Sequence, residues 1–152
     1  MQSLHMTVYR DFMKQFDKWN EVKKETDKAQ MHFKIKPREI FWVKIGQNIG
    51  HEEFGKGKEF VRPVIMIRQL TSDLFVGVPT TTTKKDSNDY FHNIHYTNHR
   101  KGEVHSVAML LQFRTYSKKR LLSKMGTVNK NEFDVIVEKL KGIIDPTHKP
   151  SL

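Results

Sequence analysis

The chain of 152 residues contains no cysteine, which excludes disulfide bonds, thiol catalysis and thiolate metal sites. It also lacks any run that approaches the roughly 20 apolar residues of a membrane span. The first residues, MQSLHMTVYRDF, have no apolar core of the kind that a signal peptide needs. Internal repeats and low-complexity linkers are absent as well. We therefore expect one compact cytoplasmic domain with an appendage and no membrane partner.

Acidic residues are scarce relative to basic ones, because 17 Asp and Glu face 27 Lys and Arg, for a formal net charge of +10. Such an excess of positive charge favours binding to a polyanion such as nucleic acid, and equally to an acidic protein. A basic surface that is merely solvated is the alternative, and the charge alone does not separate the two.

The N-terminal part predicts an amphipathic helix over residues 8–28. Its apolar residues recur at steps of three and four and form one stripe, made of Val8, Phe12, Phe16, Trp19 and Val22. A helix of this kind packs on its own domain or docks on another chain. It could also extend a dimer or occupy a binding groove, and the sequence does not rank these placements.

From residue 36 the pattern changes to short runs of β-branched and aromatic residues separated by turns, which predicts a small barrel or a strongly bent sheet. A last amphipathic stretch predicts a helix that closes the core, capped by Asn129 or Asn131 and stopped by Pro146. We therefore divide the chain into an N-terminal extension and connector (1–35), a barrel domain (36–146) and a C-terminal tail (147–152).

The stretch GHEEFGKGKEF, residues 50–60, begins like a phosphate-binding loop but does not complete the motif. Position 57 is glycine where magnesium binding requires serine or threonine. Pro63 then prevents the helix that would present its N-terminus to the phosphates. The sequence thus predicts a flexible basic loop here.

Three histidines, His92, His95 and His99, suggest a metal site at first sight. In a strand, however, His92 and His95 point to opposite faces, and no cluster of carboxylates accompanies them. We expect no metal site and no cofactor, and histidines that face solvent or RNA.

Four motifs then follow one another in a fixed order along the chain. They are REIFWVKIGQNIGHE (38–52), RPVIMI (62–67), VGVPTTT (76–82) and SVAMLLQFRTYSKKRLLSKMG (106–126), followed by the final helix. Over roughly residues 36–145, this ordered set resembles the MazF/PemK family of toxin endoribonucleases.

The resemblance implies a mainly β fold with helices, namely an SH3-like bent β-barrel of the MazF/PemK/CcdB type with a C-terminal helix, to which this chain adds its N-terminal helix. It also implies a homodimer that cuts single-stranded RNA, including mRNA, without the ribosome and without a metal. Cleavage through the 2′-hydroxyl would leave a 2′,3′-cyclic phosphate and a 5′-hydroxyl. An acidic antitoxin would be the protein partner, and DNA would be reached only through the antitoxin.

The family's two characteristic active-site residues correspond to Arg62, of the Arg-Pro pair, and Thr81, near the end of the next strand. The chemistry agrees, since a metal-free enzyme must stabilise the charge on a pentacovalent phosphorus with fixed donors such as a guanidinium and a hydroxyl. Pro63 restricts Arg62 to an extended conformation, which would hold the cation still. The alternative for Arg62 is a structural ion pair with Glu53 or Glu59.

Further residues carry secondary predictions. Glu52, which matches the glutamate of the family's Gly-x-Glu turn, and His51 are candidates to orient or assist Arg62. Gln112 and Arg114 are expected on one side of a strand, where they contact RNA or organise the barrel or dimer. Ser117 is the expected cap of a following short helix. The candidate RNA-binding residues are Lys56, Lys58, Thr83, Lys84, Lys85, Gln112 and Arg114.

Two other functions compete with the endoribonuclease. A gyrase poison of the CcdB type shares the barrel, but that family relies on a tryptophan close to its C-terminus, whereas tryptophan occurs here only at positions 19 and 42. A relative that binds RNA without cutting it would keep the charge and the groove. The presence of both Arg62 and Thr81 argues against this second alternative.

Overall fold

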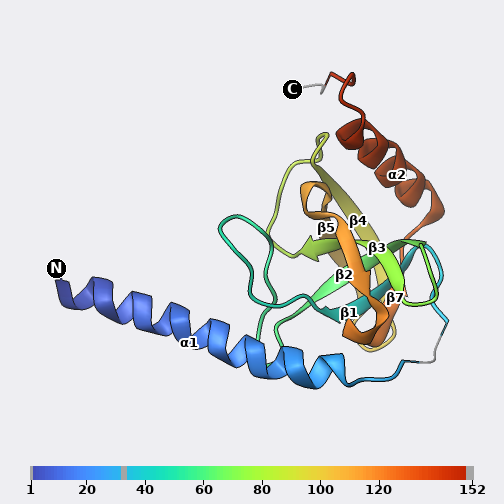
Figure 1. The fold of residues 1–152 in the computed structure, drawn as a ribbon. Helices are drawn as coiled ribbons and strands as arrows, with labels where there is room; N and C mark the ends of the chain where they lie inside the picture. Colours follow the sequence, from blue (N-terminus) through green and yellow to red (C-terminus); the bar gives the residue numbers. More distant parts are fainter. Residues whose placement is uncertain (1, 32–33, 150–152) are drawn as a thin grey trace.

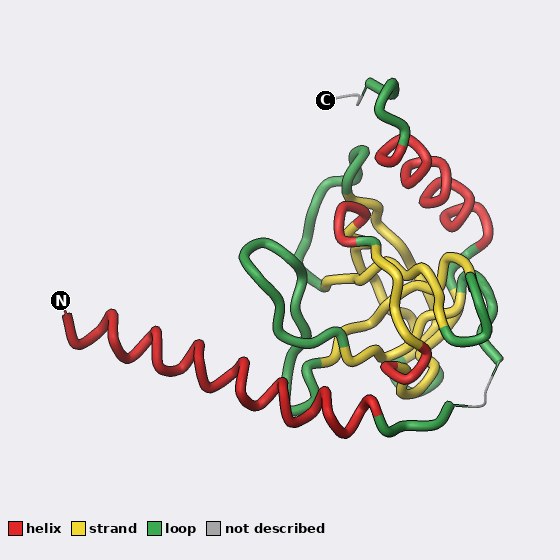
Figure 2. The backbone as a smooth tube through the Cα atoms, viewed as in Figure 1, coloured by secondary structure: helices red, strands yellow, loops and turns green. Residues whose placement is uncertain are grey.

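The computed structural model describes residues 2–31 and 34–149, with side chains from residue 15 onward. In this part of the chain, seven antiparallel strands form one curled sheet in the order β4-β5-β3-β2-β1-β7, with β6 paired to β3 (Figures 1 and 2). The strands are β1 (Glu39–Lys44), β2 (Val61–Gln69), β3 (Leu74–Thr81), β4 (Phe91–Asn98), β5 (Gly102–Met109), β6 (Arg114–Ser117) and β7 (Leu121–Thr127). The helices are α1 (Gln2–Asp27) and α2 (Lys130–Ile144), and two 3-10 turns are η1 (Leu110–Gln112) and η2 (Lys118–Arg120).

The two end strands of this order, β4 and β7, approach each other and give the sheet its barrel-like curl. At Gly126 of β7 an added Cβ atom would lie 2.6 Å from the carbonyl oxygen of Thr97 in β4. Only a glycine leaves room for so close an approach of two backbones. The predicted mainly β fold, a bent barrel with a helix at each end, is confirmed.

Each face of the sheet buries its own apolar core. Alternation along the strands sends Ile40 and Ile65 into one cluster and Phe41 and Val64 into the other. The first core is closed by α2, whose Ile136 is fully buried. Since both faces are covered, the strands read in the sequence as nearly continuous apolar runs.

Both predicted caps are present. The Asn129 side chain accepts a hydrogen bond from the backbone N–H of Asn131 at 2.8 Å, and α2 ends at Ile144, ahead of Pro146. Ser117 caps η2 in the same way, accepting from the N–H of Lys119 at 3.2 Å.

Helix α1 begins at Gln2, so the predicted start near residue 8 was too late. Its C-terminal turns run beside the barrel, where Trp19 is buried, while its N-terminal turns point away from it (Figure 1). The side chains of Val8 and Phe12, predicted for the apolar stripe, lie outside the described residues. Neither helix of the described chain has an apolar stretch long enough to cross a membrane.

One predicted strand is broken in two. β5 ends at Met109, and η1 then turns the chain away, with the N–H of Leu110 bonded to the carbonyl of Tyr90 at 2.9 Å. β6 begins only at Arg114, where the chain has moved across to pair with β3. The prediction that Gln112 and Arg114 share one side of a strand was therefore wrong, because Gln112 ends the 3-10 turn.

Candidate active site

Arg62 lies near the start of β2, opposite Val43 of β1, and is only 6% exposed. Its guanidinium donates to the carbonyl oxygen of Phe54 at 2.9 Å through Nε and to that of Thr80 at 3.3 Å through Nη1. Its Nη2 lies 2.7 Å from the Glu53 carboxylate. Three contacts to fixed partners hold the cation in one orientation, which is the preorganisation that electrostatic catalysis requires.

Thr81, the last residue of β3, lines the same cavity of about 370 Å³ as Arg62. Its hydroxyl oxygen accepts a hydrogen bond from the N–H of Thr83 at 3.2 Å, so its own hydrogen is left to donate elsewhere. Thr80 is buried and donates its hydroxyl to the carbonyl of Pro63 at 3.3 Å. Because β3 ends at Thr81, the alternation of faces along a strand applies to Thr80 and Thr81 but not to the two threonines that follow.

The cavity is positively charged. Lys56 and Lys101 line it together with Arg62, and none of the described residues that line it is acidic. Burial raises the pKa of Tyr96, whose hydroxyl is hydrogen-bonded to Ser106 in the cavity wall. Its polar lining consists of Lys56, Arg62, Thr80, Thr81, Thr82, Tyr96, Asn98, Lys101 and Ser106. Such a set of donors and cations suits a phosphate group.

The carboxylate beside Arg62 belongs to Glu53, one of the two partners considered from the sequence. The other, Glu59, lies 3.7 Å from Lys44 instead. Glu52 is exposed, and its carboxylate accepts from the N–H of Ile49 at 3.1 Å within its own turn. Neither Glu52 nor His51 lines the cavity of Arg62, and their assisting roles stay predictions.

Gln112 supports the segment that carries Glu53. Its side-chain oxygen accepts from the N–H of Glu53 at 3.0 Å, and its side-chain nitrogen donates to the carbonyl of His51 at 2.9 Å. Arg114 stacks over the ring of Tyr116 at 4.9 Å, and burial raises the pKa of that phenol to about 12. Two roles were predicted for Gln112, namely contact with RNA and organisation of the barrel or dimer. Its hydrogen bonds within the protein match the organising role.

The other predicted RNA-binding residues are spread over the surface. Lys56 lines the cavity, and Lys58 is exposed nearby in the chain. Lys84 and Lys85 are exposed and line a separate hollow of about 440 Å³. Thr83 is exposed beyond the end of β3.

Several cavity residues were missed from the sequence, among them Asn98, Lys101 and Ser106. Asn98 uses its side-chain oxygen to accept from the N–H groups of Arg100 and Lys101 at 2.8 and 3.3 Å, and so shapes the turn between β4 and β5. The basic string NHRKG is the signal that could have pointed to this turn.

His92 and His95, which were predicted not to form a metal site, contact different residues. Nδ1 of His92 lies 3.0 Å from Nζ of Lys139, and His95 lies 3.5 Å from Glu132. In the part of the chain that the structure describes, no three His, Asp or Glu residues are grouped so that they could hold a metal ion.

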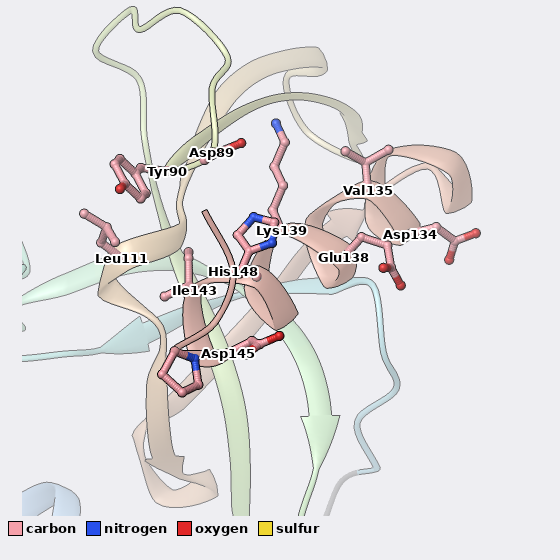
Figure 3. Close-up of a pocket in the computed structure, with 12 residues that line it drawn as sticks. Asp89, Tyr90, Leu111, Asp134, Val135, Glu138, Lys139, Ile143, Asp145 and His148 are labelled. Atoms are coloured by element: carbon pink, nitrogen blue, oxygen red, sulfur yellow. The ribbon is translucent and has the colours of Figure 1, made fainter. Parts of the chain in front are cut away.

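A larger hollow of about 920 Å³ lies beside α2 (Figure 3). Leu111, Val135 and Ile143 supply apolar surface there, and its acidic residues are Asp89, Asp134, Glu138 and Asp145. Four carboxylates against Lys139 and His148 suit a phosphodiester less well than the cationic cavity does, and this hollow shares no lining residue with the cavity of Arg62. The smaller cavity is therefore the candidate active site.

The curled sheet holds a buried arginine in a cationic cavity, and a cavity of this kind is suited to an anionic ligand. Comparison with family models matches residues 36–144 to the family described as the PemK-like, MazF-like toxin of type II toxin-antitoxin system. The chain belongs to this family, whose description implies a toxin with an antitoxin as its partner. A comparison with curated proteins gave no match.

Proposed function

We propose that the protein is a metal-independent, sequence-selective endoribonuclease that cuts single-stranded RNA without the ribosome. The main support for this proposal is that Arg62 and Thr81 line the same cationic cavity. None of the described residues that line this cavity is acidic. Family membership supports the same reaction, because PemK-like and MazF-like toxins are generally ribonucleases.

In the proposed reaction, the 2′-hydroxyl of the substrate loses its proton and its oxygen bonds to the adjacent phosphorus. The bond from phosphorus to the 5′-oxygen breaks, and that oxygen takes up a proton. The products are a 2′,3′-cyclic phosphate and a 5′-hydroxyl, with no net gain or loss of protons. Negative charge on the phosphoryl oxygens rises along this path, and it is this charge that the enzyme must stabilise.

Arg62 is the proposed source of that stabilisation. Its guanidinium carries five N–H donors, and the three contacts to Phe54, Thr80 and Glu53 leave others for phosphate oxygens. The hydroxyl of Thr81 supplies a further donor. Because the arginine is already fixed, little reorganisation is needed when charge develops.

The partners follow from charge and family. We propose single-stranded RNA as substrate, a homodimer as the active form, and an acidic antitoxin whose flexible segment covers the cationic cavity. The cytoplasm, where mRNA and antitoxin meet, is the proposed site of action, and contact with DNA would come only through the antitoxin.

The decisive experiment incubates the purified protein with a long single-stranded RNA in EDTA and maps both the cut positions and the end chemistry. We expect discrete cuts with cyclic phosphate ends. Arg62→Ala should lower kcat by about 100-fold or more, as expected for loss of a preorganised donor to the transition state. Full activity in Arg62→Ala, or cuts that vanish in EDTA, would contradict the proposal.

The ion pair between Arg62 and Glu53 favours one other function. An arginine already neutralised by a carboxylate also fits a relative that binds RNA without cutting it. RNA that is bound but left intact by the wild-type protein would support that alternative.

A further inference from the structure

Trp19 of α1 packs against both ends of the segment that connects β1 to β2, residues 45–60, which we name the arginine loop. The Trp19 side chain is buried, and its ring centroid lies 5.6 Å from that of Phe60 at the end of the loop. At the start of the loop, a Cβ atom added to Gly46 would overlap the Trp19 ring. One indole therefore contacts both ends of the arginine loop.

The two ends of the loop are also bonded to each other. The N–H of Gly46 donates to the carbonyl of Phe60 at 3.1 Å, and the carbonyl of Gly46 accepts from the N–H of Gly55 at 2.8 Å. Gly46 has φ +91° and Phe60 has φ +55°, which is the left-handed region. For Phe60 this conformation is strained and persists only where surrounding contacts enforce it. The indole of Trp19 supplies such a contact.

The interior of the same loop holds the guanidinium of Arg62. The carbonyl of Phe54 accepts from Nε, and the carboxylate of Glu53 pairs with Nη2. The Asn48 side chain links the interior to the base, because it donates to the carbonyls of Glu53 at 2.6 Å and of Ile45 at 3.3 Å. A shift at the base of the loop is thereby transmitted to two of the three groups that orient Arg62.

Trp19 is itself fixed from another side. The guanidinium of Arg120 lies 5.8 Å from the centre of the Trp19 ring, and its Nη1 donates to the carbonyl of Lys44 at 2.9 Å, at the end of β1. The indole is therefore enclosed between η2 and the arginine loop. None of the described side chains of α1 lines the cavity itself, so any effect of Trp19 on the site passes through the loop.

We propose that Trp19 is a positioning residue for Arg62, and that α1 contributes to catalysis by holding the arginine loop in its active conformation. The inference rests on the proposed endoribonuclease function. Trp19 lies before the matched segment 36–144, so the N-terminal extension of this chain provides a support that the matched domain does not contain.

The test compares three variants of the full-length protein with the wild type, all at a temperature where each is folded. Trp19→Ala removes the indole and Trp19→Phe keeps an aromatic ring. Ile136→Ala is the matched control, because it removes buried apolar volume from α2 in the core that lies away from the arginine loop. Two quantities are measured, namely hydrogen exchange of the loop amides and the separate kcat and KM for RNA cleavage.

For Trp19→Ala we expect exchange at Gly46 and Gly55 to rise about tenfold or more, since these amides report local opening of the loop. We expect kcat to fall by about tenfold while KM changes less than about threefold, because misplacement of a fixed catalytic group mainly affects the chemical step. Trp19→Phe should restore most of both quantities. Ile136→Ala should lower the melting temperature and leave loop exchange and kcat close to wild type.

Unchanged loop exchange in Trp19→Ala would overturn the inference, as would an equal rise in Ile136→Ala. Increased exchange with an unchanged kcat would also overturn it, because the loop would then move without affecting Arg62. If the wild-type protein cleaves no RNA, the proposed function fails, while the exchange arm still decides whether Trp19 holds the loop.

Discussion

At the scale of single residues, the charge of Arg62 is the feature that needs most support from its surroundings. A guanidinium that is only 6% exposed has lost most of its hydration, and this is costly unless an opposite charge and hydrogen bonds replace the water. Glu53 supplies the opposite charge at 2.7 Å, and its own side chain is 20% exposed. The ion pair between Arg62 and Glu53 therefore affects both the stability of the fold and the orientation of the proposed catalytic group.

We predict that Glu53→Gln destabilises the protein by about 2 kcal/mol, because a mostly buried cation loses its counter-charge. Cleavage should also slow by about tenfold, because Arg62 is then less firmly oriented. Urea unfolding gives the first quantity, and kcat on a short RNA gives the second.

The matched control is Glu59→Gln, in the same loop. Glu59 is more than half exposed and lies 3.7 Å from Lys44, so its loss should change stability by less than about 1 kcal/mol. Glu52→Gln serves as a third variant. If it slowed cleavage more than Glu53→Gln does, the assisting role predicted for Glu52 would be favoured over the orienting role of Glu53.

The sequence predicts Arg62 and Thr81 as neighbours but does not identify which glutamate pairs with the arginine. Positions 52 and 53 have the same chemistry, and Glu59 is closer along the chain. The choice depends on the path of the arginine loop, which is held in part by Gln112, a residue about 60 positions away in the sequence. A contact between residues so far apart in the chain leaves no recognisable pattern in the sequence of the loop itself.

At the scale of elements, the interface between α2 and β4 contains a pair of basic groups. Lys139 of α2 lies 3.0 Å from Nδ1 of His92 in β4. Burial is the main cause that lowers the pKa of His92 below its ordinary value of 6.5, and the Lys139 cation lowers it further, while Glu132 opposes the change. Burial also lowers the pKa of Lys139, against the attraction of Asp89.

We therefore predict that this interface weakens in acid. A histidine whose pKa is lowered by folding is neutral in both states at high pH and contributes nothing there. As the pH falls through 6.5 the unfolded chain binds the proton first, so the free energy of unfolding decreases. Urea unfolding at about pH 7.5 and about pH 5.5 should show this decrease, and His92→Gln should make it smaller.

His105→Gln is the control for that prediction. His105 is exposed in β5, and its ring contacts that of His95 in a tilted arrangement with centroids 4.8 Å apart; the contact between His92 and Lys139 does not include it. A pH dependence that stays the same in His92→Gln, or that His105→Gln reduces equally, would contradict the assignment to the α2 interface.

The elements themselves were largely predictable, because runs of β-branched and aromatic residues mark most strands and helical periodicity marks both helices. The break at Leu110–Gln112 was not, since MLLQF is mostly apolar and contains no glycine or proline. What bends the chain is the bond from Leu110 to Tyr90 and the pairing of β6 with β3, and both are long-range. The start of α1 was missed for another reason, because the apolar stripe from which the helix was predicted begins at Val8.

At the scale of the whole molecule, the charge of +10 is distributed between a cavity and an outer surface. Lys56, Lys101 and Arg62 line the cavity, while Lys84 and Lys85 are exposed after β3, the strand that ends in Thr81. Two of the three lysines on α2, by contrast, are paired with acids on the same helix, Lys130 with Asp134 and Lys141 with Glu138. The molecule as a whole is therefore basic, but its sides differ in how far that charge is neutralised.

This difference predicts which lysines contact RNA. Affinity for single-stranded RNA should fall with salt, with a slope in log K against log salt of about −0.7 for each phosphate contacted. Replacing Lys84 and Lys85 together by alanine should reduce the magnitude of the slope by about 1.4. The measurement is a salt titration of binding to a 2′-O-methyl RNA, which has no free 2′-hydroxyl and so stays intact.

The double variant Lys130→Ala and Lys141→Ala removes the same total charge from α2 and is the matched control. Because each of these lysines lies within 3.0 Å of a carboxylate on its own helix, their removal should leave the slope unchanged. If both double variants reduced the slope equally, net charge rather than a defined RNA path would govern binding. If only the α2 variant reduced it, the RNA would have to cross α2, and the lysines after β3 would belong to the solvated surface instead.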